Sequence, residues 1–212
     1  MQTTEIDIAL SEVILKGDLV LPKKAIGMVI FSHGSGSSRL SSRNRLVAET
    51  LQQQGIGTFL FDLLTEEEDR NYENRFNIDL LTSRLIETTL WLLEDTEAKD
   101  LPLGYFGAST GAASALRAAA HFRKTIKAVV SRGGRPDLAL SELHLVTAPT
   151  LLIVGGNDVP VIGMNKLAYD ALVCPKEMKI IPGATHLFEE PGKLLEVSEL
   201  AIEWYKKHLV ND

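Results

Sequence analysis

Short, almost fully apolar runs alternate with longer segments of helical periodicity along this chain, and this alternation most constrains its fold. Parallel strands buried on both faces appear as continuous apolar runs, and each needs a crossover to the next. The sequence therefore predicts an α/β fold in three layers, a mostly parallel central sheet with helices on both faces. The expected strands span residues 26–32, 56–62, 103–107, 127–131, 150–155 and 179–181, and the expected helices span residues 39–54, 76–93, 110–122, 162–172 and 193–209.

The first part of the chain departs from this alternation. Residues 6–10 and 13–21 have the pattern of strands with no helix between them, which predicts an antiparallel N-terminal edge on the sheet. The connection between residues 131 and 150 is too short to hold a separate lid domain. We therefore expect residues 1–212 to form a single domain without a lid.

A long polar stretch, residues 66–75, begins with an acidic run and ends with arginines. One interpretation is a solvated loop that precedes a helix. The other is a mobile flap beside a site at the ends of the strands.

The composition excludes several kinds of partner. The chain has 22 basic and 28 acidic residues and a net charge of −6, and an acidic chain repels nucleic-acid phosphates, so we expect no nucleic-acid partner. A single cysteine, Cys174, excludes an internal disulfide framework and a multi-cysteine metal site.

The first residues lack the pattern of a secretory signal, and the apolar runs are too short to span a bilayer. We expect a cytoplasmic protein with no membrane partner, either a monomer or a small homo-oligomer.

The segment Gly107-Ala-Ser109-Thr-Gly111 fits the pattern G-x-S-x-G between an apolar strand and an alanine-rich helix. A serine at such a sharp turn has a strained backbone, and small neighbours are needed on either side. The turn exposes the hydroxyl and places it at a helix N-terminus, where developing negative charge is favoured. The pattern predicts that Ser109 is a nucleophile.

A serine hydroxyl needs an oriented base to remove its proton. His186 follows the last expected strand after the turn 182–185, whereas His121, His144 and His208 lie in places typical of structural or solvated histidines. Asp158 follows the expected strand 150–155 and would orient the imidazole. Asp137 is a competing candidate for that acid.

Two backbone N–H groups would bind the oxyanion. We expect one from Thr110, directly after the nucleophile, and the other from Ser35 in the glycine-rich loop that starts with His33 and Gly34. A rival interpretation of this loop is a dinucleotide-binding turn, but Arg39 occupies the place of the third glycine of that motif.

Arginines are expected at the same edge of the sheet. Arg132 follows the strand 127–131, with Arg135 close by, and Arg39 and Arg43 begin the helix after the glycine-rich loop. They either hold a carboxylate or phosphate of the substrate or form ion pairs with nearby acids. The expected substrate-binding residues are His33, Gly34, Arg39 and Arg132.

The motifs at 33–37, 107–111, 155–158 and 183–186 together resemble the dienelactone hydrolase-like family of the α/β-hydrolase superfamily. The resemblance covers nearly the whole chain. It implies an ester-cleaving Ser-Asp-His site that uses no metal and no organic cofactor. The enzyme that gives the family its name has a cysteine nucleophile, whereas this chain has Ser109.

The sequence thus predicts a serine hydrolase that cleaves a small-molecule carboxylic ester, lactone or thioester through an acyl-enzyme. Two other classes remain open. One is a non-catalytic scaffold that binds a small anionic ligand. The other is a transferase or lyase that uses the same residues with an acceptor other than water.

Overall fold

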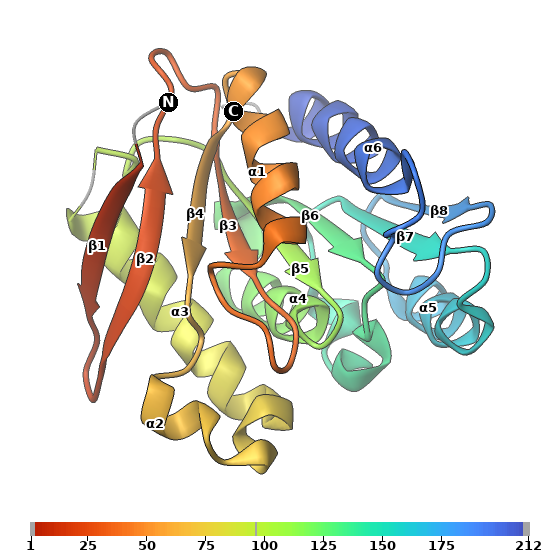
Figure 1. The fold of residues 1–212 in the computed structure, drawn as a ribbon, viewed down its shortest axis with the longest axis horizontal. Helices are drawn as coiled ribbons and strands as arrows, with labels where there is room; N and C mark the ends of the chain where they lie inside the picture. Colours follow the sequence, from red (N-terminus) through yellow and green to blue (C-terminus); the bar gives the residue numbers. More distant parts are fainter. Residues whose placement is uncertain (1–2, 96, 210–212) are drawn as a thin grey trace.

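A computed structural model describes residues 3–95 and 97–209 of the protein. Its strands form one eight-stranded sheet in the order β1-β2-β4-β3-β5-β6-β7-β8 (Figure 1). β2 runs antiparallel to both β1 and β4, and all other neighbours are parallel. The strands are β1 (Thr4–Ala9), β2 (Ile14–Val20), β3 (Met28–Ser32), β4 (Gly57–Phe61), β5 (Leu103–Ala108), β6 (Ile126–Arg132), β7 (Thr150–Gly155) and β8 (Lys176–Ile181).

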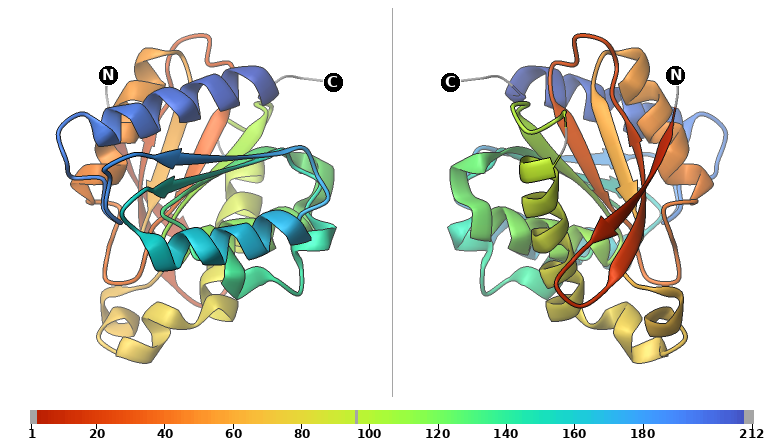
Figure 2. Two further views of the ribbon diagram at one scale, coloured as in Figure 1. Left: turned by 90° about the vertical axis from the view of Figure 1, so that its right-hand side faces the viewer. Right: turned by 90° about the vertical axis from the view of Figure 1, so that its left-hand side faces the viewer.

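Helices cover both faces of the sheet. α1 and α6 pack against each other on one face, and α3, α4 and α5 lie on the other; Figure 2 (left) views the strands with α6 above and α5 below. The three-layer prediction, with its antiparallel N-terminal edge, is confirmed. The α-helices are α1 (Ser42–Gln53), α2 (Glu66–Asp69), α3 (Ile78–Asp95), α4 (Gly111–Phe122), α5 (Val159–Ala171) and α6 (Lys193–His208), and the 3₁₀ helices are η1 (Tyr72–Phe76), η2 (Arg123–Thr125), η3 (Pro136–Ala139) and η4 (Leu143–Leu145).

Some boundaries differ from the predictions for identifiable reasons. α1 begins at Ser42 rather than residue 39, because the Ser41 hydroxyl caps it by accepting the N–H of Asn44. β8 begins at Lys176 rather than residue 179, since this edge strand carries charged residues that interrupt the apolar pattern. The polar stretch 66–75 is not an irregular loop but holds α2 and most of η1.

The core consists of two apolar layers, one on each face of the sheet. The central strands β3, β4 and β5 are buried along their whole length, as their apolar sequences require. The C-terminal helix is attached to the centre of the sheet, because the buried hydroxyl of Tyr205 donates a 2.6 Å hydrogen bond to the carbonyl oxygen of Tyr105. Within residues 3–95 and 97–209, none of the helices combines the length and the apolar character needed to cross a membrane.

The start of α4 approaches the sheet very closely. A Cβ at residue 111 would lie 2.1 Å from the carbonyl oxygen of Ser32, and a Cβ at residue 107 would lie 2.5 Å from the Cα of Ala112. Glycine is therefore required at both positions because the contacting atoms belong to the backbone and cannot move aside. The alanines of α4 let the rest of the helix keep this short separation from the sheet.

We expect Gly111→Ala to lower the free energy of unfolding by about 3 kcal/mol or more, because the new methyl group overlaps the backbone of β3. The matched control is Gly163→Ala in α5, where a Cβ would meet nothing within 4 Å. This control should raise the free energy by about 0.5–1 kcal/mol, the usual gain in a helix interior. Urea unfolding measures both, and equal effects would contradict the close approach.

Candidate active site

Ser109 stands at a sharp turn between β5 and α4. Its φ is +51°, in the left-handed region that a non-glycine residue adopts only at some cost in energy. Two backbone hydrogen bonds hold this conformation: the Ser109 N–H donates to the carbonyl oxygen of Arg132 at 3.2 Å, and the Ser109 carbonyl accepts from the N–H of Arg135 at 2.9 Å. The end of β6 and the segment that follows it thus fix the turn that exposes the hydroxyl.

His186 lies between Ser109 and Asp158. The distance from His186 Nδ1 to Asp158 Oδ2 is 2.7 Å, and that from Nε2 to Ser109 Oγ is 3.3 Å. Asp158 directly follows the turn after β7, and His186 lies in the loop after β8, so three strand ends supply the three side chains. The competing acid Asp137 forms a two-pronged ion pair with Arg135 at 2.9 Å. The structure therefore brings Asp158, and not Asp137, to the imidazole.

This arrangement suits proton transfer. A carboxylate that accepts the Nδ1–H leaves Nε2 unprotonated and facing the serine hydroxyl. The 3.3 Å separation is at the long end for a hydrogen bond, which is common before substrate binds. The His186 side chain is 38 % exposed and that of Asp158 is 13 % exposed, so the base faces solvent while its partner is shielded.

The glycine-rich loop after β3 lies directly against Ser109. A Cβ at residue 34 would come within 3.0 Å of Ser109 Cβ, so the absence of a side chain at Gly34 permits this approach. The N–H of Ser35 donates to Thr110 Oγ1 at 2.9 Å. The two residues predicted to supply the oxyanion donors are therefore adjacent, and an oxyanion between them would take the Ser35 N–H from the Thr110 hydroxyl.

His33 occupies a supporting position rather than the ligand-facing one predicted for it. It is buried, its Nδ1 bonds the carbonyl oxygen of Gly34 at 2.9 Å, and its Nε2 accepts the N–H of Leu63 at 3.0 Å. Neither ring nitrogen is free for a ligand. Burial lowers the pKa of His33, and the neutral ring links the glycine-rich loop to the segment after β4.

The polar stretch 66–75 borders the same region. A Thr65–Glu68 capping box starts α2. The glycine-rich loop, Leu63, Leu81, Asp69 and Arg75 line a small, partly open cavity of about 10 Å³. Arg75, which the sequence analysis did not single out, is held by Asp69 at 2.8 Å, and its Nη1 would lie 3.8 Å from a Cβ at residue 36. No local motif marks this arginine, because its position depends on the fold.

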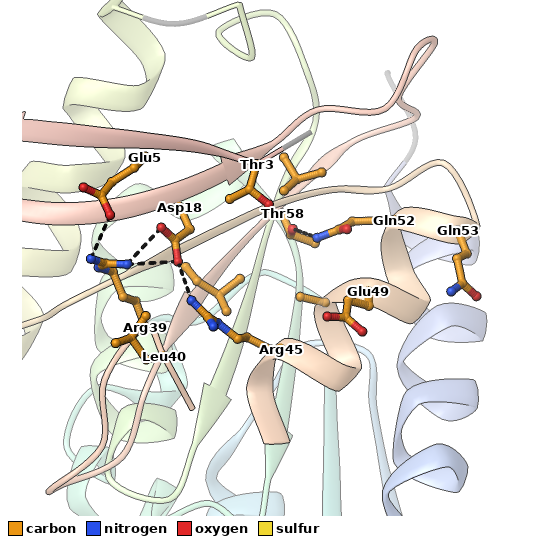
Figure 3. Close-up of a pocket in the computed structure, with 13 residues that line it drawn as sticks. Thr3, Glu5, Asp18, Arg39, Leu40, Arg45, Glu49, Gln52, Gln53 and Thr58 are labelled. Carbon is orange, nitrogen blue, oxygen red and sulfur yellow. Dashed lines mark hydrogen bonds and ion pairs between the residues drawn. The ribbon is translucent and has the colours of Figure 1, made fainter. Parts of the chain in front are cut away.

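Arg39 is committed to carboxylates, as the ion-pair interpretation of the arginines predicts. Its guanidinium contacts Asp18 at 3.0 Å and Glu5 at 3.1 Å (Figure 3). It also contacts Asp62 at 3.2 Å. It lines a groove of about 830 Å³ between α1 and the strands β1, β2 and β4, which does not include the three side chains around His186. This groove is therefore separate from the candidate active site.

Arg132, at the end of β6, is buried with 6 % exposure. Its Nη2 donates to Asn44 Oδ1 at 3.3 Å, and its Nε has no hydrogen-bond partner among the described residues. Burial, together with the charge of Arg43, lowers the pKa of Arg132 to about 10. Arg132 forms no ion pair with any residue in the ranges 3–95 and 97–209.

A metal centre is not evident in the part of the chain that the structure describes, where no cluster of three or more His, Cys, Asp or Glu side chains is suited to hold an ion. Cys174 lies beside the start of β7, at the other end of this strand from Asp158. Its thiol is 3.7 Å from the Thr150 hydroxyl. Burial raises the pKa of this thiol, which disfavours the reactive thiolate.

The neutral state of His33 generates a pH prediction. The unfolded chain binds more protons than the folded one below the ordinary histidine pKa of 6.5, so stability that is present above this pH should be lost as the pH falls through the folded pKa. We expect the excess stability of the native protein over His33→Gln to shrink between pH 7.5 and pH 5 in urea unfolding.

The exposed His144 gives the control variant, His144→Gln, which should leave the pH profile unchanged. The pKa of His208 is also lowered, mainly by burial, and His208→Gln separates its share. A constant difference between the native protein and His33→Gln at every pH would contradict the neutral, backbone-bonded ring.

Comparison with known proteins identifies the family of this chain. The model of the Dienelactone hydrolase family matches residues 15–207. A crystal structure described as dienelactone hydrolase from Anabaena variabilis is 55 % identical, with a TM-score of 0.96 and coverage of 98 % of each chain. The esterase domain of a Rhodothermus marinus protein, 18 % identical, has a TM-score of 0.80 over 99 % of this chain and 100 % of its own, which supports the α/β-hydrolase fold alone.

Two curated Mycobacterium tuberculosis sequences, provisionally named phosphoribosyl transferases, are 53 % identical over 209 residues. The match covers 99 % of this chain and 47 % of theirs, so the chain spans about half the length of these relatives. With the family model matched over most of its length, the chain belongs to the dienelactone hydrolase family of the α/β-hydrolase superfamily.

Proposed function

We propose that this protein is a serine hydrolase that cleaves a carboxylic ester, lactone or thioester through an acyl-enzyme on Ser109. One observation carries the proposal: the His186 imidazole lies 3.3 Å from the Ser109 hydroxyl and 2.7 Å from Asp158. Membership of the dienelactone hydrolase family supports hydrolysis as the reaction class.

The reaction proceeds in two steps of acyl transfer. Ser109 Oγ attacks the carbonyl carbon while His186 Nε2 takes the hydroxyl proton, and Asp158 stabilises the resulting imidazolium. When the tetrahedral intermediate collapses, the leaving alcohol or thiol receives that proton and the acyl group stays on Ser109. Water then attacks the acyl-enzyme with His186 as the base, which releases the acid and restores the hydroxyl.

The oxyanion of the intermediate needs donors at the place where negative charge develops. In this proposal the N–H of Thr110 is one donor. The N–H of Ser35 becomes the other when it exchanges the Thr110 hydroxyl for the substrate oxygen. Such a charged acceptor makes a stronger bond than the hydroxyl does, which favours the exchange.

Phosphoribosyl transfer is not proposed for this chain, since the mycobacterial relatives that carry that name are about twice its length. A non-catalytic scaffold and an acyltransferase are the alternatives. Hydrolysis of short p-nitrophenyl esters separates the enzyme from the scaffold, and product analysis with an added alcohol or amine detects acyl transfer. A cytoplasmic location and the oligomeric state stay predictions.

We expect Ser109→Ala to lose labelling by a fluorophosphonate probe and to lower kcat for ester hydrolysis by at least about 10³-fold, because no other group replaces the nucleophile. Circular dichroism should show an unchanged fold. The control Ser83→Ala changes an exposed serine on α3 and should retain labelling. Labelling that persists in folded Ser109→Ala would place the nucleophile elsewhere.

A second pair of variants tests the acid. Asp158→Asn should lower kcat by about 10²–10⁴-fold, because an amide no longer stabilises the imidazolium or fixes its tautomer. Asp137→Asn should change kcat less than about threefold, since Asp137 is paired with Arg135. Steady-state kinetics on one ester measures both, and the reverse ranking would transfer the role to Asp137.

A further inference from the structure

Within residues 3–95 and 97–209, Arg132 differs from the arginines around it in having no acidic partner. Arg39, Arg75 and Arg135 each contact an aspartate at 3.0 Å or less, whereas Arg132 has only a long hydrogen bond to Asn44 within the described residues. A buried cation without a counter-charge lowers stability, because desolvation is not offset by attraction. An anion bound beside such a group would supply the missing counter-charge.

The surroundings of Arg132 favour an anion in a second way. Its guanidinium points to the first turn of α1, where Asn44 accepts its hydrogen bond and no acidic residue is present. The N-terminus of a helix carries partial positive charge and N–H groups suited to oxyanions. Arg43, in the same turn, lies close enough for its charge to act on Arg132, and its Nε is also buried without a partner.

There is also open space beside this turn. Arg43 lines a groove of about 440 Å³ together with four serines, Ser37, Ser38, Ser41 and Ser42. The groove also has one carboxylate in its lining, Asp69, whose charge is paired with Arg75 at 2.8 Å. Arg43 pairs with Glu189, whose side chain is 61 % exposed, so this ion pair is screened by water. An incoming anion can compete with such a surface pair.

The backbone of Arg132 contacts the candidate active site. Its carbonyl oxygen accepts the N–H of Ser109, and a Cβ at residue 133 would lie 3.5 Å from His186 Nδ1. The backbone of residues 132 and 133 therefore adjoins both the nucleophile and the base.

We propose that Arg132, Arg43 and the first turn of α1 form an anion-binding subsite that holds a carboxylate or phosphate group of the substrate. That the substrate is an ester rests on the proposed function. Anion binding itself can be tested without catalysis. The subsite selects esters that carry a negative charge on the part of the molecule away from the scissile bond.

The binding test uses Ser109→Ala protein, which cannot turn over an ester by the proposed route. Sodium phosphate and sodium succinate are compared with sodium chloride at equal ionic strength, and thermal unfolding is followed. An anion at ten times its Kd should raise Tm by about 3–6 °C. A shift with phosphate alone identifies a phosphate site, and a shift with succinate alone identifies a carboxylate site. No shift with either overturns the subsite.

Arg132→Met in the same background separates binding from a structural role. The subsite predicts loss of the anion-dependent shift and an anion-free Tm equal to or above that of the parent, because an uncompensated buried charge is removed. A structural arginine would give a lower anion-free Tm and an unchanged shift, which overturns the subsite. Arg45→Gln, on the same helix and paired with Asp18, is the charge-matched control and should keep the shift.

Kinetics with active protein then test the link to substrate. Arg132→Met should lower kcat/KM for an ester with a remote carboxylate or phosphate by about 10–150-fold, the equivalent of one charged hydrogen bond, and for a neutral ester of equal size by less than about threefold. Equal losses overturn the subsite. Absence of any Ser109-dependent hydrolysis instead overturns the proposed function, while the anion-dependent Tm shift remains a separate result.

Discussion

The contact on which the rest of the molecule depends is the approach of α4 to the end of β3. With hydrogen as its side chain, Gly111 lets the helix backbone touch the carbonyl of Ser32, and the chain must then turn sharply between β5 and α4. This turn gives Ser109 its left-handed conformation and lifts its hydroxyl above the sheet. Two backbone hydrogen bonds to the segment that starts at Arg132 keep it there. The loops after β7 and β8 then only have to deliver a carboxylate and an imidazole to a fixed point.

Around this point, neutral and charged groups have different tasks. His33 is a buried neutral ring whose two nitrogens form hydrogen bonds with the backbone of two loops. It therefore stabilises the conformation of the glycine-rich loop. The ion pairs of Arg39, Arg75 and Arg135 hold neighbouring loops in place from outside. Since these guanidiniums already have acidic partners, they are poorly placed to recognise a ligand. Among the residues that the structure describes, Arg132 has no such partner, and this contrast distinguishes it.

The sequence could predict the fold and the meeting of Ser109, Asp158 and His186, because parallel strands end at one edge and each of these residues follows such a strand. It could also have revealed α2, since Thr65 and Glu68 form a capping box that local spacing displays. The partners of Arg39 were not predictable in this way, because Asp18 and Asp62 lie 21 and 23 residues away along the chain and their approach is set by sheet order. The hydrogen bond that His33 Nε2 accepts was not predictable for the same reason, because its donor, Leu63, lies 30 residues away.

The ion pairs of Arg39 have a consequence for how the molecule acquires its final shape. Through Glu5, Asp18 and Asp62, this one guanidinium joins β1, β2 and the end of β4 to the segment that leaves the glycine-rich loop. That segment is therefore anchored to β1, β2 and β4, and not to the strands that carry Ser109, Asp158 and His186. If the first two strands were detached, Arg39 would keep only its contact with Asp62, while β3 and β5 to β8 would retain their mutual pairing. The conformation of the loop beside Ser109 is in this sense coupled to the docking of the antiparallel edge of the sheet.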